Sequence, residues 1–238
     1  SIPPAHRIIT ALDVETKAQA LELVRGLDQA ALFKVGLELF TAEGPALLRE
    51  IKALGKEVFL DLKLHDIPNT VRGAAAAAGA LGAELLTVHA TGGEAMLRAA
   101  VEGAAAAGRG TRVVAVTLLT SLDARAMPPG FARPFDLGGT VAELLETAER
   151  AGALGIVCSA ADLGPLRERR GGRPFYAVTP GIRPAGGEAN DQKRVATVTE
   201  AVRGGASLLV LGRAVTAAPD PRAALEAARA ERDAALRG

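Results

Sequence analysis

Residues 59–70, FLDLKLHDIPNT, begin as a β-strand and end as a turn that leads into a helix. Side chains alternate between the two faces of a strand, so this strand has a leucine face and a polar face. The leucine face carries Leu60, Leu62 and Leu64, and the polar face carries Asp61, Lys63 and His65. Taken alone, the pattern is typical of a strand with one face in solvent, where Asp61 and Lys63 would form an ordinary surface ion pair.

Short runs rich in leucine and β-branched residues recur along the chain, separated by segments with helical periodicity such as 14–29 and 138–152. The expected strands are 7–13, 32–37, 58–64, 85–90, 112–119, 155–159, 174–180 and 207–213. Alternating strands and helices predict a parallel sheet. Eight such units in 238 residues favour an α/β fold of the (β/α)8 TIM barrel type over an open doubly wound sheet. No GxGxxG motif follows the first strand and no linker divides the chain, so we expect a single domain over residues 1–238.

The composition argues against several classes of function. A formal net charge of +1 and an aromatic content of 3% provide neither a basic surface for nucleic acid or anionic membranes nor many platforms for stacking bases. The sequence contains no 18-residue uncharged apolar run and no recognisable leader, so we expect a soluble, cytoplasmic protein. Cys158 is the only cysteine, which rules out an intrachain disulfide and a paired-cysteine metal site, and we expect it to act as a small buried hydrophobe.

A barrel changes the interpretation of the charged strand. Helices cover one face of each barrel strand and packed side chains fill the other, so neither face is open to bulk solvent. The leucines are then expected to meet the helices, which puts Asp61 and Lys63 in the interior near the carboxyl-terminal mouth, where barrel enzymes hold catalytic groups. Asp13 ends the first expected strand and Lys34 lies in the second. Since these strands are neighbours, we expect a row of alternating charge in which a lysine stays protonated and can donate a proton.

Two loops carry residues suited to binding phosphate. TPGIRPAGGEANDQKR (179–194) follows the seventh expected strand and LGRAVTAAPDP (211–221) the eighth, the positions at which barrels often bind phosphate. Gly212 allows close approach of the backbone to an oxyanion, and Arg213 supplies a bidentate donor at the start of a helix. We therefore expect a phosphorylated ligand, with residues 181–190 as a lid.

Taken together, these motifs resemble those of one family. DLKLHDIPNT (61–70) fits the Asp-x-Lys-x-x-Asp-Ile-x-x-Thr signature of the orotidine 5′-phosphate decarboxylase family, which the sequence resembles across essentially its whole length. The other matching segments are ALD (11–13), FKVG (33–36), LTS (119–121), TPGIRP (179–184), DQ (191–192) and LGR (211–213). The resemblance implies decarboxylation of orotidine 5′-monophosphate to uridine 5′-monophosphate, the final step of de novo pyrimidine nucleotide synthesis, without a metal or an organic cofactor.

The same resemblance implies roles for individual residues. Lys63 would donate a proton to C6 and stabilise the developing carbanion, and Asp61 would lie beside the departing carboxylate. Lys34 and Asp13 would hold ribose hydroxyls and complete the charge row. Asp66 would be a further catalytic residue. The remaining substrate contacts would come from Ile67, Thr70, Thr120 (to the pyrimidine ring), Pro180, Arg183, Gln192 (bridging phosphate and base), Gly212 and Arg213.

In this family, Asp66 and Thr70 would reach the active site of a neighbouring subunit, so the resemblance implies an obligate homodimer. The residues alone offer a simpler role for Asp66, as the N-cap of a helix that begins near Pro68. For His89, we expect a structural role in the barrel interior.

Two alternatives remain at this point. One is a sugar-phosphate decarboxylase or aldolase on the same barrel, which would use Mg²⁺ and an enediolate intermediate. The other is a barrel that only binds nucleotides. The continuation Ile-Pro-Asn-Thr (67–70) and the 179–194 loop favour the orotidine enzyme over the first, and the presence of both Asp61 and Lys63 weighs against the second.

Overall fold

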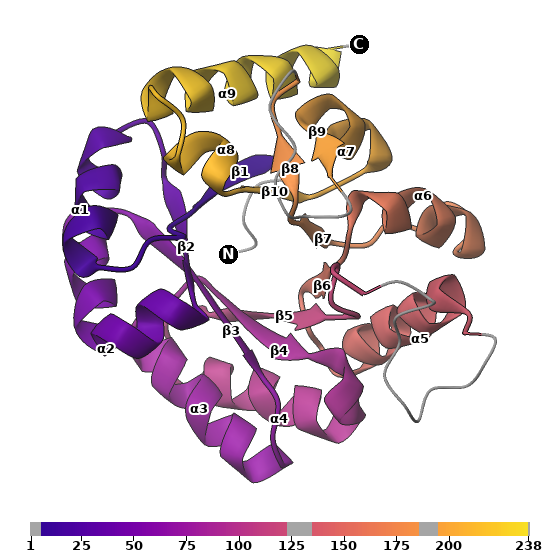
Figure 1. Cartoon of the computed structure of the whole chain (residues 1–238). Helices are drawn as coiled ribbons and strands as arrows, with labels where there is room; N and C mark the ends of the chain where they lie inside the picture. The colour runs from indigo at the N-terminus through magenta and orange to yellow at the C-terminus, as the bar shows by residue number, and fades with distance from the viewer. Residues whose placement is uncertain (1–5, 123–134, 186–194, 238) are drawn as a thin grey trace.

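The computed structural model describes residues 6–122, 135–185 and 195–237. In this part of the chain, eight parallel strands close into a barrel in the order β1-β10-β7-β6-β5-β4-β3-β2 (Figure 1). Their bounds are β1 Arg7–Ala11, β2 Leu32–Gly36, β3 Glu57–Leu64, β4 Leu85–His89, β5 Arg112–Val116, β6 Gly155–Val157, β7 Ala177–Thr179 and β10 Leu208–Leu211. Every strand expected from the sequence is present, and the (β/α)8 barrel is confirmed.

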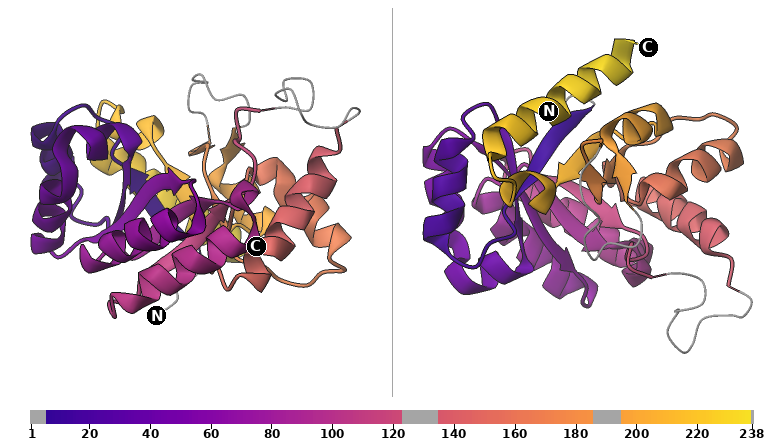
Figure 2. Two further views of the ribbon diagram at one scale, coloured as in Figure 1. Left: turned by 90° about the horizontal axis from the view of Figure 1, so that it is seen from below. Right: turned by 45° about the horizontal axis from the view of Figure 1, so that its top comes forward.

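Helices surround the barrel, with α1 and α2 on the side opposite α5 and α6 (Figures 1 and 2). They are α1 Lys17–Gly26, α2 Leu37–Ala53, α3 Pro68–Ala80, α4 Gly93–Ala106, α5 Leu137–Arg150, α6 Ala160–Arg169, α7 Val198–Gly204, α8 Arg213–Thr216 and α9 Pro221–Arg237, and a 3-10 turn, η1 Ala90–Gly92, precedes α4. The sequence did not predict the short pair β8 Ile182–Arg183 and β9 Ala196–Thr197, which lies within the connection that follows β7. None of the described helices is both long and apolar enough to cross a membrane.

Side chains of the strands separate into two apolar clusters, as alternation requires. One fills the barrel interior and includes Phe59 of β3, whereas the other lies between the strands and the helices and includes Leu60. Leu62 and Leu64 pack against that outer cluster, so the expected leucine face is confirmed. Cys158 is also buried in the outer cluster, where burial raises the pKa of its thiol, and the expected role as a buried hydrophobe is confirmed.

Regular alternation in β3 ends at a bulge. Leu60 pairs with Leu86 of β4 and Leu64 pairs with Val88, so three residues of β3 lie opposite the single residue Thr87. Within this bulge Lys63 has a φ of 49°, in the left-handed region that residues other than glycine rarely adopt. The bulge brings the end of the strand closer to Asp61 than a regular strand would.

One expectation for the segment after the bulge is wrong. His65, which follows β3, is exposed, and its ring lies against that of His89, with centroids 5.5 Å apart. Asp66 was a candidate N-cap, but the N-cap of α3 is Ile67 and Pro68 begins the helix. The Asp66 carboxylate accepts instead from the amide of Ile67 at 2.6 Å, because its position one residue early leaves the first helical amides out of reach.

Candidate active site

A cavity of about 300 Å³ opens at the carboxyl-terminal ends of the strands. Its walls come from the strands and from the connections that follow β1, β5, β7 and β10, so residues far apart in sequence meet there. The lining includes nine of the site residues expected from the sequence: Asp13, Lys34, Asp61, Lys63, Thr120, Pro180, Arg183, Gly212 and Arg213.

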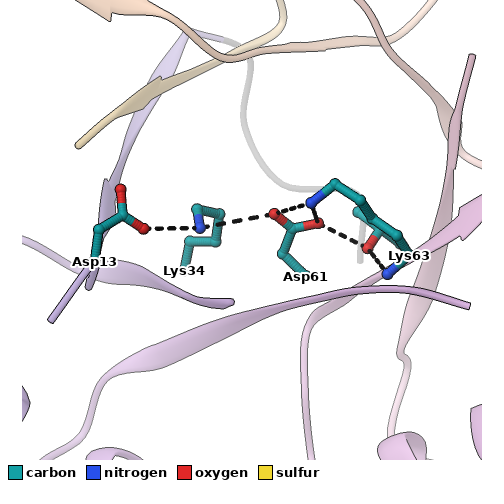
Figure 3. Close-up of polar contacts among 5 residues, drawn as sticks. Asp13, Lys34, Asp61 and Lys63 are labelled. Carbon is teal, nitrogen blue, oxygen red and sulfur yellow. Dashed lines mark hydrogen bonds and ion pairs between the residues drawn. The ribbon is translucent and has the colours of Figure 1, made fainter. Parts of the chain in front are cut away.

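Four of these residues form the expected row of alternating charge (Figure 3). Lys34 Nζ lies 3.2 Å from Asp13 Oδ1 and 3.7 Å from Asp61 Oδ2. At the end of the row, Lys63 Nζ donates to both carboxylate oxygens of Asp61 at 2.8 Å. The structure therefore places two ammonium groups on either side of one carboxylate at the mouth of the barrel.

The centre of the row is shielded from solvent and its outer end is not. Asp61 and Lys34 expose 12% and 14% of their side chains, against 47% for Asp13. Burial by itself raises the pKa of Asp61, but the charges of Lys34 and Lys63 outweigh it and hold that pKa below its ordinary value. Asp61 is thus an anion at neutral pH, and it supplies a fixed negative charge beside the Lys63 ammonium.

Thr87 of β4 lies beneath this row, where it is fully buried. Its hydroxyl donates to Asp61 Oδ1 at 2.9 Å and accepts from the backbone amide of Lys63 at 2.8 Å. Sequence reasoning did not single out Thr87, because a buried threonine in a strand is common and nothing in LLTVH (85–89) indicates which residues lie opposite it.

The far wall of the cavity carries the residues expected to bind phosphate. Arg183 lies in β8, and Gly212 and Arg213 mark the start of α8. Gly212 has a packing reason to be glycine, since a Cβ added there would lie 2.8 Å from Asp13 Oδ2. The backbone at Gly212 thus approaches the charge row closely and brings the two walls together.

Other expected site residues lie elsewhere. Asp66, Ile67 and Thr70 are exposed near the start of α3 and do not line the cavity. Gln192 and the second half of the expected lid, residues 186–190, lie outside the described residues. His89 also does not line the cavity, and burial, together with the charges of His65 and Lys63, lowers its pKa.

No group of three or more His, Cys, Asp or Glu side chains within residues 6–122, 135–185 and 195–237 is arranged to hold a metal ion.

Comparisons with known proteins agree with this architecture. The family model described as "Orotidine 5'-phosphate decarboxylase / HUMPS family" matches residues 6–228. A protein named orotidine 5'-phosphate decarboxylase from Anaeromyxobacter dehalogenans is 54% identical to the chain, and the match covers 94% of this chain and 97% of that protein. Another of the same name from Moorella thermoacetica is 50% identical, and the match covers 94% of this chain and 91% of that protein. The crystal structure of orotidine 5'-phosphate decarboxylase from Lactobacillus acidophilus is similar with a TM-score of 0.82 and 35% identity, covering 96% of this chain and 99% of that one.

Proposed function

Because the chain belongs to the orotidine 5′-phosphate decarboxylase family, we propose that the cavity at its barrel mouth is the site of that family's reaction. The enzyme is a lyase that converts orotidine 5′-monophosphate to uridine 5′-monophosphate and CO2, the final step of UMP biosynthesis. The observation that carries the assignment of the site is the contact of Lys63 Nζ with both oxygens of Asp61, 2.8 Å away, at the end of a four-residue charge row.

In the proposed mechanism, the bond between C6 and the carboxylate breaks and its electron pair remains on C6. Lys63 stabilises this developing carbanion as a fixed cation and then transfers a proton from Nζ to C6, after which solvent reprotonates the amine. Asp61 lies beside the departing carboxylate and keeps the Lys63 ammonium oriented. The low pKa of Asp61 supports this role, since the carboxylate must remain charged throughout.

Substrate binding is proposed to use the rest of the cavity wall. Asp13 and Lys34 hold ribose hydroxyls, and Thr120 contacts the pyrimidine ring. The phosphate is bound by guanidinium and backbone donors on the β8 and α8 side of the cavity, where a dianion would complement the local positive charge. The residues proposed to bind the phosphate are Arg183, Gln192, Gly212 and Arg213, and Pro180 is a further substrate contact.

We also propose that the active unit is a homodimer in which Asp66 and Thr70 complete the neighbouring subunit's site, with Ile67 as a further substrate contact. Exposure of this segment outside its own cavity supports the assignment, since Asp66 and Thr70 are exposed and the apolar residue between them, Ile67, is 66% exposed. Residues 1–238 are proposed to form one domain that works in the cytoplasm, since the pathway's substrates are soluble nucleotides.

The test is the ultraviolet absorbance change on adding orotidine 5′-monophosphate to the wild type and to Lys63→Ala, each with and without EDTA. We expect decarboxylation that is insensitive to EDTA and lost in Lys63→Ala. Lys17→Ala, at the start of α1 and outside the cavity lining, is the matched control and should behave as wild type. Wild-type protein that binds uridine 5′-monophosphate without turnover would instead indicate a phosphate-binding barrel, and activity abolished by EDTA would indicate metal-dependent chemistry.

A further inference from the structure

Thr87 lies at the only point on β4 that faces the β3 bulge. The strand pairing advances from Leu60 and Leu86 directly to Leu64 and Val88, so Asp61 and Lys63 both lie opposite Thr87. A bulge of this kind leaves backbone groups without their regular partners in the ladder. The Lys63 amide finds a side-chain acceptor instead, the Thr87 hydroxyl at 2.8 Å.

The same hydroxyl also fixes the carboxylate of Asp61. A threonine hydroxyl has one proton to donate and can accept from other groups. Because Thr87 Oγ1 accepts from the Lys63 amide, its own proton is directed to Asp61 Oδ1, 2.9 Å away. Thr87 Oγ1 thus holds both the backbone of Lys63 and the side chain of Asp61. Because Lys63 Nζ also donates to Asp61, these hydrogen bonds form a closed ring.

We propose that Thr87 is a positioning residue for decarboxylation, which holds Lys63 in its left-handed backbone conformation and Asp61 in the orientation that receives the Lys63 ammonium. The inference rests on the proposed function of Lys63 and Asp61. Lys63 keeps an uncommon φ of 49°, and such conformations persist where surrounding contacts determine them. The Thr87 hydroxyl is one such contact, and it is buried beneath the reacting groups, so it does not need to touch the substrate.

Burial alone does not account for the hydrogen bonds of Thr87. Thr10 in β1 and Thr179 in β7 are equally buried, and their hydroxyls have no hydrogen-bond partner in the described part of the chain. The barrel therefore accepts threonine at buried strand positions without using its hydroxyl. Thr10 is consequently a matched control for removing a buried hydroxyl from this sheet.

The electrostatic setting gives a readout that a purely structural role would not change. Asp61 faces Lys34 and Lys63, with Asp13 on the far side of Lys34 and His89 on the same strand as Thr87. The hydrogen bond from Thr87 is one of the interactions that lower the pKa of Asp61. Without it, the pKa of Asp61 rises, so the acid limb of the kcat/KM profile should move to higher pH.

The experiment compares wild type with Thr87→Val, Thr87→Ser and Thr10→Val in the same absorbance assay across pH. Valine keeps the shape of threonine but carries a methyl group in place of the hydroxyl. We expect Thr87→Val to lose about 10- to 100-fold in kcat, the range for a lost hydrogen bond to a charged group. Its acid limb should move to higher pH, while its affinity for uridine 5′-monophosphate should stay within about threefold, because the phosphate contacts are elsewhere.

Thr87→Ser retains the hydroxyl and should restore most of the activity and the wild-type pH profile, and Thr10→Val should match wild type throughout. Thr87→Ala provides a second test with the same expected shift of the acid limb if the valine variant does not fold. The proposal is overturned if Thr87→Val behaves as Thr10→Val, or if turnover, nucleotide binding and stability fall together with an unchanged pH profile. If wild type and Thr10→Val both fail to decarboxylate orotidine 5′-monophosphate, the proposed function itself is overturned. That outcome differs from a loss of activity that occurs only in the Thr87 variants.

Discussion

Lys63 Nζ contacts both carboxylate oxygens of Asp61 at 2.8 Å, although the two residues are only two positions apart on the same strand. A regular strand would project both side chains from the same face, about 7 Å apart at their origins. In this chain the bulge in β3 bends the strand between them, and the lysine side chain folds back over the carboxylate. The pair thus combines a fixed anion with a proton donor in one short segment.

Removal of the Lys63 amine should abolish the proton transfer and spare nucleotide binding. For Lys63→Ala we expect kcat to fall by at least about 10³-fold, near the range for loss of a general acid together with its charge. The dissociation constant for uridine 5′-monophosphate, measured by calorimetry, should change little. A loss of nucleotide binding equal to the loss of turnover would show that Lys63 serves binding instead of chemistry.

Asp61 should make a contribution to stability that depends on pH. Its pKa in the folded protein lies below the ordinary value of 3.8, so its stabilising contribution is fully present above that value and is lost as pH falls through the folded-state pKa. Denaturant unfolding of wild type and Asp61→Asn should therefore give a constant difference in unfolding free energy near pH 7. That difference should shrink below about pH 4, and an unchanged difference in acid would contradict the assignment.

A methyl group at residue 212 should disturb the charge row. The Cβ of Gly212→Ala would lie 2.8 Å from Asp13 Oδ2, so the half-exposed Asp13 side chain must shift, which disturbs its contact with Lys34. We expect KM for orotidine 5′-monophosphate to rise about tenfold. Gly164→Ala in α6, where a Cβ would meet no atom within 4 Å, is the control and should leave the kinetics unchanged.

Shared active sites can be tested by mixing inactive subunits. If Asp66 acts in the neighbouring site, Lys63→Ala and Asp66→Ala homodimers should both be impaired, whereas a mixed dimer has one site with neither substitution. Subunit exchange should then restore up to about a quarter of wild-type activity, since half of the dimers are mixed and each has one intact site. No recovery after verified exchange would place Asp66 and Lys63 in the same subunit's site.

Arg170 at the end of α6 should matter for stability and not for catalysis. Its side chain is only 5% exposed, donates to both carboxylate oxygens of Glu149 in α5 and lies over the ring of Phe175. We expect Arg170→Met to lower the free energy of unfolding by about 1–3 kcal/mol, through loss of a bidentate pair and a cation–π contact. The decarboxylation kinetics at 25 °C should be those of wild type.

The sequence predicted the parts of this protein that depend on local pattern. Strand and helix periodicities were sufficient for the eight-stranded barrel. The positions of Asp13, Lys34, Asp61 and Lys63, in or just after three neighbouring strands, were sufficient for the charge row. The bulge could not be predicted in this way, because it depends on how β3 pairs with β4, more than twenty residues away. For the same reason the sequence missed Thr87.

The closure of the barrel also sets the order in which the site can be assembled. All four charged residues of the row precede residue 64, whereas β1 finds its second neighbour only in β10, whose end leads directly into Gly212 and Arg213. During synthesis the chain thus carries its reactive charges long before the strand that closes the barrel exists. The strand that closes the barrel also leads into Gly212 and Arg213, the last of the residues proposed to bind phosphate. A partly synthesised chain therefore carries the charge row before its substrate pocket is complete.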